Sequence, residues 1–126
     1  MKIPTDLRFT RDHEWIRAED DSATIGITEF AQDELGEIVF VELPEVGQEL
    51  QKGETLCVVE STKAASDVYC PVSGKVIEVN STLSESPDLV NSSPYKEGWM
   101  VKLELSDQDE LSSLLDADKY EQVVES

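Results

Sequence analysis

Short segments of strand-type sequence, separated by frequent turn signals, place the tightest limit on how this chain folds. Ala23, Ile25 and Ile27 recur at every second position, as do the apolar residues between 99 and 105, and this period places alternate side chains on one face of a strand. Residues 38–41 form a continuous β-branched and aromatic run, which predicts a strand covered on both sides. Further strands are expected over residues 14–17, 56–59 and 76–79, with turns at 44–47, 52–53, 71–74 and 94–98.

Helices are expected at two places only. Thr28 can cap a short helix over residues 29–35, and Gly36 can end it in the left-handed conformation. An acidic turn followed by leucines at helical spacing predicts a helical C-terminal segment over about residues 106–124. Within this segment, Asp116 can cap a second short helix that ends near Val124. With 126 residues, the chain is expected to form one domain, residues 1–126. The predicted fold is mostly β, a small β-sandwich or flattened barrel with a short internal helix and C-terminal helices.

The charge of the chain limits its partners. Asp and Glu number 28 against 10 Lys and Arg, a formal net charge of −18. Such a surface repels phosphate backbones and anionic lipid, so neither nucleic acid nor a membrane is expected as a partner. The absence of a signal-peptide core and the use of only two cysteines favour a reducing cytoplasm. Asn80 and Asn91 each begin an Asn-X-Ser/Thr triplet, but without a secretory signal neither is expected to be glycosylated.

Lys63 lies between two strand-like segments, at the predicted tip of a hairpin. A tight turn centred on Lys63 and Ala64 would place Glu60 opposite Asp67. Two-residue turns of this kind favour Asn-Gly or another pair that tolerates positive φ. The use of Lys-Ala therefore indicates that the lysine is kept for a reason other than turn geometry.

The aromatic residues and the cysteines are assigned to packing. Trp15, Trp99 and Phe40 have alternating apolar neighbours and are expected to anchor the core. The single histidine and two cysteines match no zinc spacing, so no metal site is expected. The predicted hairpin register sets Cys57 opposite Cys70, which would permit a cross-strand disulfide under oxidising conditions.

Residues 53–80, including the run Glu60-Ser61-Thr62-Lys63-Ala64, closely resemble the lipoyl-lysine region of glycine cleavage H proteins. The resemblance extends in order through residues 13–15, 24–28, 35–44 and 91–100. It implies a lipoyl-domain-like fold and lipoate joined by an amide to Lys63. It also places Glu60 where the family has a glutamate associated with recognition by the ligase. Glu14 and Asp67 match family positions near a resting cleft, and we expect them to hold the loaded arm.

The function implied by this resemblance is that of a carrier, not an enzyme. The lipoyl arm would take an aminomethyl group from glycine decarboxylase (P protein) to the tetrahydrofolate-dependent aminomethyltransferase (T protein). The resulting dithiol would go to dihydrolipoamide dehydrogenase (L protein) for reoxidation. A lipoate ligase or lipoyl-transfer enzyme would attach the group. The expected location is the bacterial cytoplasm, or the mitochondrion for a mature organellar form.

Other carriers and other classes of protein are alternatives to this function. Biotin domains flank their lysine with methionines, whereas Thr62 and Ala64 flank Lys63 here. Lipoyl domains of 2-oxoacid dehydrogenases usually belong to larger chains with flexible linkers. A lipoate reservoir serving other enzymes needs the same lysine and stays open. An unmodified acidic interaction domain, or a thiol enzyme built on Cys57 or Cys70, would belong to another class altogether.

Overall fold

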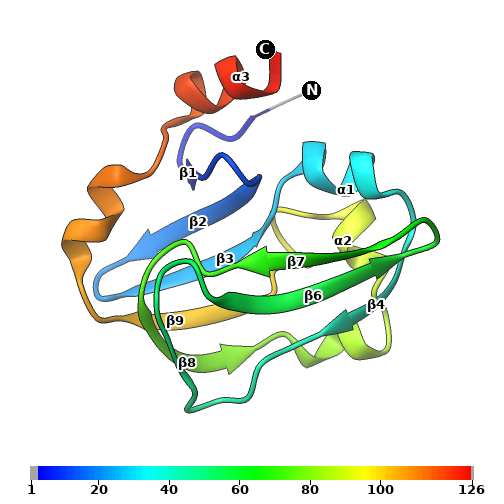
Figure 1. The fold of residues 1–126 in the computed structure, drawn as a ribbon, viewed down its shortest axis with the longest axis horizontal. Helices are drawn as coiled ribbons and strands as arrows, with labels where there is room; N and C mark the ends of the chain where they lie inside the picture. The colour runs from blue at the N-terminus through cyan, green and yellow to red at the C-terminus, as the bar shows by residue number, and fades with distance from the viewer. Residues whose placement is uncertain (1–2, 126) are drawn as a thin grey trace.

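Two antiparallel sheets form the body of the protein in a computed structural model that describes residues 3–125 (Figure 1). Residues 1–2 and 126 of the predicted domain lie outside the described residues. The six-stranded sheet contains, in spatial order, β1 (Arg8–Phe9), β2 (Glu14–Glu19), β3 (Ser22–Ile27), β9 (Val101–Leu105), β8 (Gly74–Val79) and β5 (Glu49–Leu50). The three-stranded sheet contains β4 (Ile38–Glu42), β6 (Thr55–Ser61) and β7 (Ala65–Tyr69). The prediction of a mostly β, sandwich-like fold is confirmed.

The helices are short and lie around the sheets. They are α1 (Glu29–Leu35), α2 (Leu89–Ser92) and α3 (Ala117–Glu125), with 3₁₀ turns η1 (Ser81–Ser84) and η2 (Gln108–Ser113). Thr28 caps α1 by accepting a hydrogen bond from the Ala31 amide at 3.2 Å, and Gly36 follows the helix with φ of 85°. Both predicted ends of this helix are therefore confirmed, but Gly36, with ψ of −156°, is extended at positive φ and not in the left-handed helical conformation. Of the helices described over residues 3–125, none is long and apolar enough to cross a membrane.

The C-terminal segment differs in detail from the prediction. Residues 108–113 form a 3₁₀ helix instead of an α-helix, with Asp107 accepting a hydrogen bond from the Asp109 amide at 2.9 Å. The expected second helix forms as α3, and Asp116 accepts a hydrogen bond from the Lys119 amide at 2.9 Å. The side chains of Asp107 and Asp116 can capture nearby amides locally, which is why both starts are visible in the sequence.

The core lies between the two sheets, and a smaller apolar cluster lies under α3. In this second cluster Phe9 of β1 stacks on Tyr120 of α3, with ring centroids 4.6 Å apart. Trp15 is fully buried there and donates a hydrogen bond from Nε1 to the Pro94 carbonyl at 2.9 Å. Trp99 is half-buried against the same cluster, just before β9 begins. The smaller cluster therefore fixes the start of β2, which carries Glu14.

The prediction that residues 38–41 are covered on both sides is wrong. Val39 and Phe40 are 50% and 47% exposed, whereas Ile38 and Val41 are buried. A bulge interrupts the pairing of β4 with β6 between Ile38 and Phe40. The extra residue changes the alternation of faces, so two consecutive side chains point away from the core. Phe40 is consequently a surface residue and not the core anchor that was expected.

Candidate functional site

The hairpin formed by β6 and β7 turns one residue earlier than predicted. Glu60 pairs with Ala65, and the Ser61 amide donates to the Ala64 carbonyl at 2.8 Å. The central residues of the turn are therefore Thr62 and Lys63, and the predicted register is wrong by two residues in the partner strand. Because the error is an even number of residues, Glu60 and Asp67 still share one face of the hairpin, although they are no longer directly opposite each other.

The side chain of Ser61 explains why the turn does not need Asn-Gly. Its Oγ accepts hydrogen bonds from the amides of Lys63 and Ala64, both at 3.1 Å. A serine hydroxyl can replace a backbone acceptor in this way, so the turn closes without that residue pair.

The corrected register also separates the two cysteines. Cys57 pairs with Val68, and Cys70 lies beyond the end of β7. The two thiols therefore do not face each other across the hairpin, and the geometric argument for a cross-strand disulfide no longer holds.

Lys63 is exposed at the tip of this hairpin. The backbone of the tip is also hydrogen-bonded to a segment outside the hairpin. The segment linking α1 to β4 passes beside the tip (Figure 1), and the Thr62 amide donates to the Glu37 carbonyl at 3.1 Å. The lysine stem lies against Gly36, where an added Cβ would be 3.3 Å from Lys63 Cε. The backbone of the tip is thus fixed, while the Lys63 side chain extends past Gly36 and stays exposed.

A cleft of about 370 Å³ lies between α1, the start of β2, and β7. Glu14 and Asp67 both line it, so the structure brings together the two carboxylates that the resemblance singled out. Leu35, the neighbour of Gly36, lines it as well. Glu60 is exposed and is not among the lining residues. The cleft therefore runs from near the lysine stem to a buried carboxylate.

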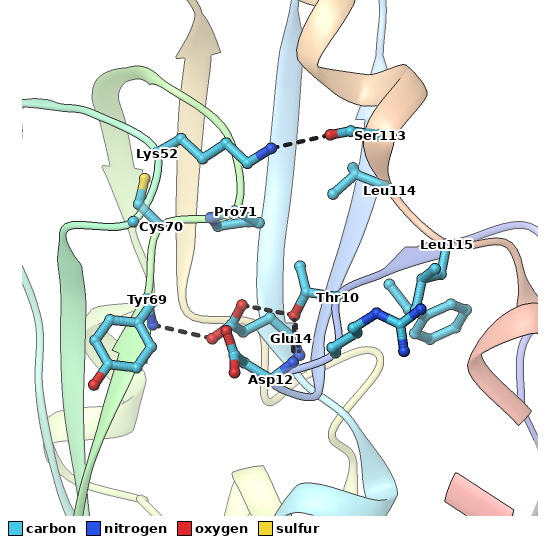
Figure 2. Close-up of a pocket in the computed structure, with 13 residues that line it drawn as sticks. Thr10, Asp12, Glu14, Lys52, Tyr69, Cys70, Pro71, Ser113, Leu114 and Leu115 are labelled. Atoms are coloured by element: carbon cyan, nitrogen blue, oxygen red, sulfur yellow. Dashed lines mark hydrogen bonds between the residues drawn. The ribbon is translucent and has the colours of Figure 1, made fainter. Parts of the chain in front are cut away.

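Glu14 is only 2% exposed, and both of its carboxylate oxygens are hydrogen-bonded. Thr10 Oγ1 donates to Oε1 at 2.8 Å and the Tyr69 amide donates to Oε2 at 3.0 Å (Figure 2). Burial raises the pKa of Glu14 to about 7, although these two hydrogen bonds oppose the rise. Glu14 also lines a second pocket, of about 270 Å³, to which Lys52 and Ser113 contribute at the far end. Figure 2 shows the residues of this pocket.

Sequence reasoning missed the residues that hold this site together. Thr10 lies four residues before Glu14, and that spacing is the only signal in the sequence for their contact. The backbone atoms of Gly36, Glu37 and Tyr69 contribute through peptide groups, whose position depends on the tertiary fold and not on residue type.

The cysteines and the histidine take part in packing. Cys57 and Cys70 are buried free thiols, and burial raises the pKa of Cys70 to about 12. A thiol in this state is a poor nucleophile at neutral pH, which argues against a thiol enzyme. His13 Nδ1 is hydrogen-bonded to the Tyr120 hydroxyl at 2.8 Å, and burial lowers the histidine pKa. Within residues 3–125, no group of three or more potential metal ligands is found.

A side chain that is to be lengthened covalently and moved between partners needs a fixed base and a free end. The anchored backbone and the exposed side chain at Lys63 are what a carrier domain of the swinging-arm type requires. A protein-family model described as the glycine cleavage H-protein matches residues 7–126 of this chain. The chain therefore belongs to the glycine cleavage H-protein family.

Individual relatives agree with this assignment over nearly the whole chain. The glycine cleavage system H protein of Symbiobacterium thermophilum is 58% identical over 94% of this chain and 93% of its own length. That of Staphylococcus haemolyticus is 53% identical over 98% of both chains. A crystal structure of the H protein from Mycobacterium marinum has a TM-score of 0.91 at 38% identity, covering 98% of this chain and 100% of that chain.

The family assignment confirms the broader functional prediction. Members of this family are lipoyl carriers that work with the other components of glycine cleavage, and they are not enzymes. The chain is accordingly a lipoyl-carrier protein of glycine cleavage.

Proposed function

We propose that Lys63 is the lipoyl attachment residue and that the chain is a non-enzymatic shuttle. Lipoate in amide linkage supplies the redox and group-transfer chemistry. The arm carries the aminomethyl group from glycine decarboxylase to the tetrahydrofolate-dependent aminomethyltransferase, and the dithiol to dihydrolipoamide dehydrogenase. The single observation that carries this proposal is the exposed Lys63 side chain at the tip of an anchored hairpin. A location in the bacterial cytoplasm is also proposed, because the relatives named above are bacterial proteins.

Glu60 is assigned to recognition by the lipoate ligase or lipoyl-transfer enzyme. Its side chain is exposed on β6, three residues before Lys63, and pairs across the hairpin with Ala65. An enzyme that binds the tip of this hairpin would meet the Glu60 carboxylate beside the amine. Charged groups at the edge of such an interface chiefly guide association and orientation.

Glu14 and Asp67 are assigned to holding the loaded arm. Both line the cleft beside the lysine, and the aminomethyl group carries a positive charge at neutral pH. A carboxylate in a poorly solvated site attracts such a cation strongly, and the cation in turn favours the ionised form of Glu14. The same cleft shields the arm from water while the protein moves between partners.

The attachment can be tested by mass spectrometry. Incubation with lipoate, ATP and a lipoate ligase should add one lipoyl group to the intact chain, and peptide mapping should place it on Lys63. The Lys63→Arg variant keeps a positive charge at the tip and should stay unmodified. A wild-type chain that stays unmodified under conditions that modify a known carrier, or an adduct on another residue, would contradict the proposal.

The shuttle role needs a second measurement, because a lipoate reservoir would use the same lysine. Lipoylated wild-type protein should support glycine-dependent reduction of NAD when combined with the three glycine cleavage enzymes and tetrahydrofolate. Loaded protein that supports no reduction in this mixture would favour the reservoir instead. The Lys63→Arg variant, carried through the same mixture, measures the background rate of NAD reduction.

A further inference from the structure

Asn91, in α2, uses its whole carboxamide to bind the segment that links α1 to β4. Its Nδ2 donates to the Gly36 carbonyl at 2.9 Å and to Gln32 Oε1 at 2.8 Å. Its Oδ1 accepts a hydrogen bond from the Ile38 amide at 2.8 Å. Both donor hydrogens and the acceptor oxygen therefore have partners. This arrangement leaves no polar atom of the side chain available for the glycan that the Asn-X-Ser triplet would otherwise suggest.

The two peptide groups that Asn91 binds lie on either side of Glu37. Residues 36–37, which we call the tip support, contact the hairpin tip directly. The Glu37 carbonyl accepts the Thr62 amide at 3.1 Å, and Gly36 lies against the stem of Lys63. Because Asn91 fixes the peptide groups before and after Glu37, it also fixes the direction in which the Glu37 carbonyl points. A hydrogen-bonded path therefore joins Asn91 to the hairpin tip.

We propose that Asn91 is a positioning residue for the modification of Lys63. It does not contact the lysine, and it acts by holding the tip support against which the hairpin tip is hydrogen-bonded. The inference rests on the proposed function, in which Lys63 receives the lipoyl group. It assigns Asn91 a part in how the unmodified lysine is presented to the enzyme that acylates it.

The expected effect on lipoylation kinetics follows from the fraction of chains whose hairpin tip has the conformation that the enzyme binds. An enzyme that binds one conformation of the tip has an apparent affinity reduced by the fraction of chains in that conformation. Once the tip is bound, the amine occupies the same place in the variant as in the wild type. Asn91→Ala should therefore raise the KM of lipoylation and leave kcat nearly unchanged. We expect kcat/KM to fall about tenfold, which corresponds to a tenfold smaller fraction of chains with the tip in the conformation that the enzyme binds.

Asn80 provides a matched control within the same chain. It also begins an Asn-X-Ser/Thr triplet, and its Nδ2 donates to the carbonyls of Glu97 and Trp99 at 2.8 and 2.7 Å. Those partners lie in the loop before β9 and not in the tip support. Asn80→Ala thus removes a comparable set of hydrogen bonds and lowers stability, while leaving residues 36–37 and the hairpin tip as they are.

The test compares wild type, Asn91→Ala and Asn80→Ala by lipoylation kinetics and by hydrogen exchange of the Thr62 amide. Asn91→Ala should raise KM and speed exchange at Thr62, while Asn80→Ala should stay within about twofold of the wild type in both measurements. Gln32→Ala removes one half-buried partner on a short helix and should change both in the same direction by less, which covers the case of an unstable Asn91 variant.

The outcomes separate this inference from the proposed function. If the wild type is lipoylated on Lys63 and the two asparagine variants behave alike, the positioning role of Asn91 is wrong while the carrier function stands. An Asn91→Ala chain with wild-type exchange at Thr62 would refute the role as well. A wild-type chain that is not modified at Lys63 overturns the proposed function, and the inference with it.

Discussion

Replacing Glu14 by glutamine should change how the stability of the protein depends on pH. Glutamine has the shape of a protonated glutamate and offers one acceptor and a donor, as the protonated carboxyl does. The wild-type carboxyl is buried, with its pKa raised from 4.5 to about 7. Below pH 4.5 both folded and unfolded wild-type chains hold the proton. The variant and the wild type should therefore differ there by a constant amount.

The direction in which the stability of the wild type changes with pH follows from which state of the chain holds the Glu14 proton. Between pH 4.5 and 7 the unfolded chain has released the Glu14 proton, whereas the folded chain still holds it. The folded wild type therefore loses stability relative to the unfolded chain as the pH rises through this window. A tenfold change in proton affinity corresponds to about 1.4 kcal/mol. The full rise in pKa thus amounts to roughly 3 kcal/mol, fully developed above pH 7.

Urea unfolding followed by tryptophan fluorescence, at pH values from 4 to 8, measures this difference, since Trp15 is fully buried next to Glu14. The free energy of unfolding of Glu14→Gln should rise relative to the wild type by up to about 3 kcal/mol across that range. The control Glu78→Gln makes the same chemical change at an exposed carboxylate and reports the effect of one lost charge. Parallel curves for Glu14→Gln and the wild type would refute the reasoning.

Three further outcomes are expected. Combining Glu14→Gln with Asp67→Asn should speed the release of ammonia from the loaded protein, and unchanged release would contradict an arm-holding role for the two carboxylates. Gly26→Ala should lower the free energy of unfolding by about 1–3 kcal/mol, because a Cβ there would be 2.7 Å from the Trp15 ring; a wild-type urea midpoint would show that the ring moves freely. The two buried thiols should react slowly with a thiol reagent in the folded protein and completely in urea. Fewer than two reactive thiols per chain in urea, after exposure of the protein to air, would show that the cysteines can form a disulfide.

The parts of the fold that could be predicted from sequence are those fixed by local chemistry. The helix over residues 29–35 was correctly bounded because Thr28 caps it and Gly36 leaves it with positive φ, and both preferences act within one turn. The alternation in β3 likewise gave its buried face, since Ala23 and Ile25 are fully buried.

The errors arose where a distant segment decides the local structure. The hairpin turn shifted by one residue because Ser61 and the Glu37 carbonyl together hold the tip, and only one of these lies in the hairpin. The exposure of Phe40 depends on a bulge against β6, which no pattern within β4 records. The site shows the same division. Glu14 and Lys63 could be named by resemblance, but the hydrogen bonds that Thr10 and Tyr69 donate to Glu14 depend on the tertiary fold.

The anchoring of the hairpin tip to the Glu37 carbonyl sets the geometry of delivery. A hinged flap could swing its cargo toward a distant catalytic centre, whereas a tip tied on two sides behaves as a stationary pivot. With the lipoyl group on Lys63, as we propose, the distance that the cargo can travel is the length of one lysine side chain plus its attached acyl chain. Each enzyme served by this carrier must therefore bring its own reacting atoms within that radius of the hairpin, so delivery requires close contact between the two proteins at every visit.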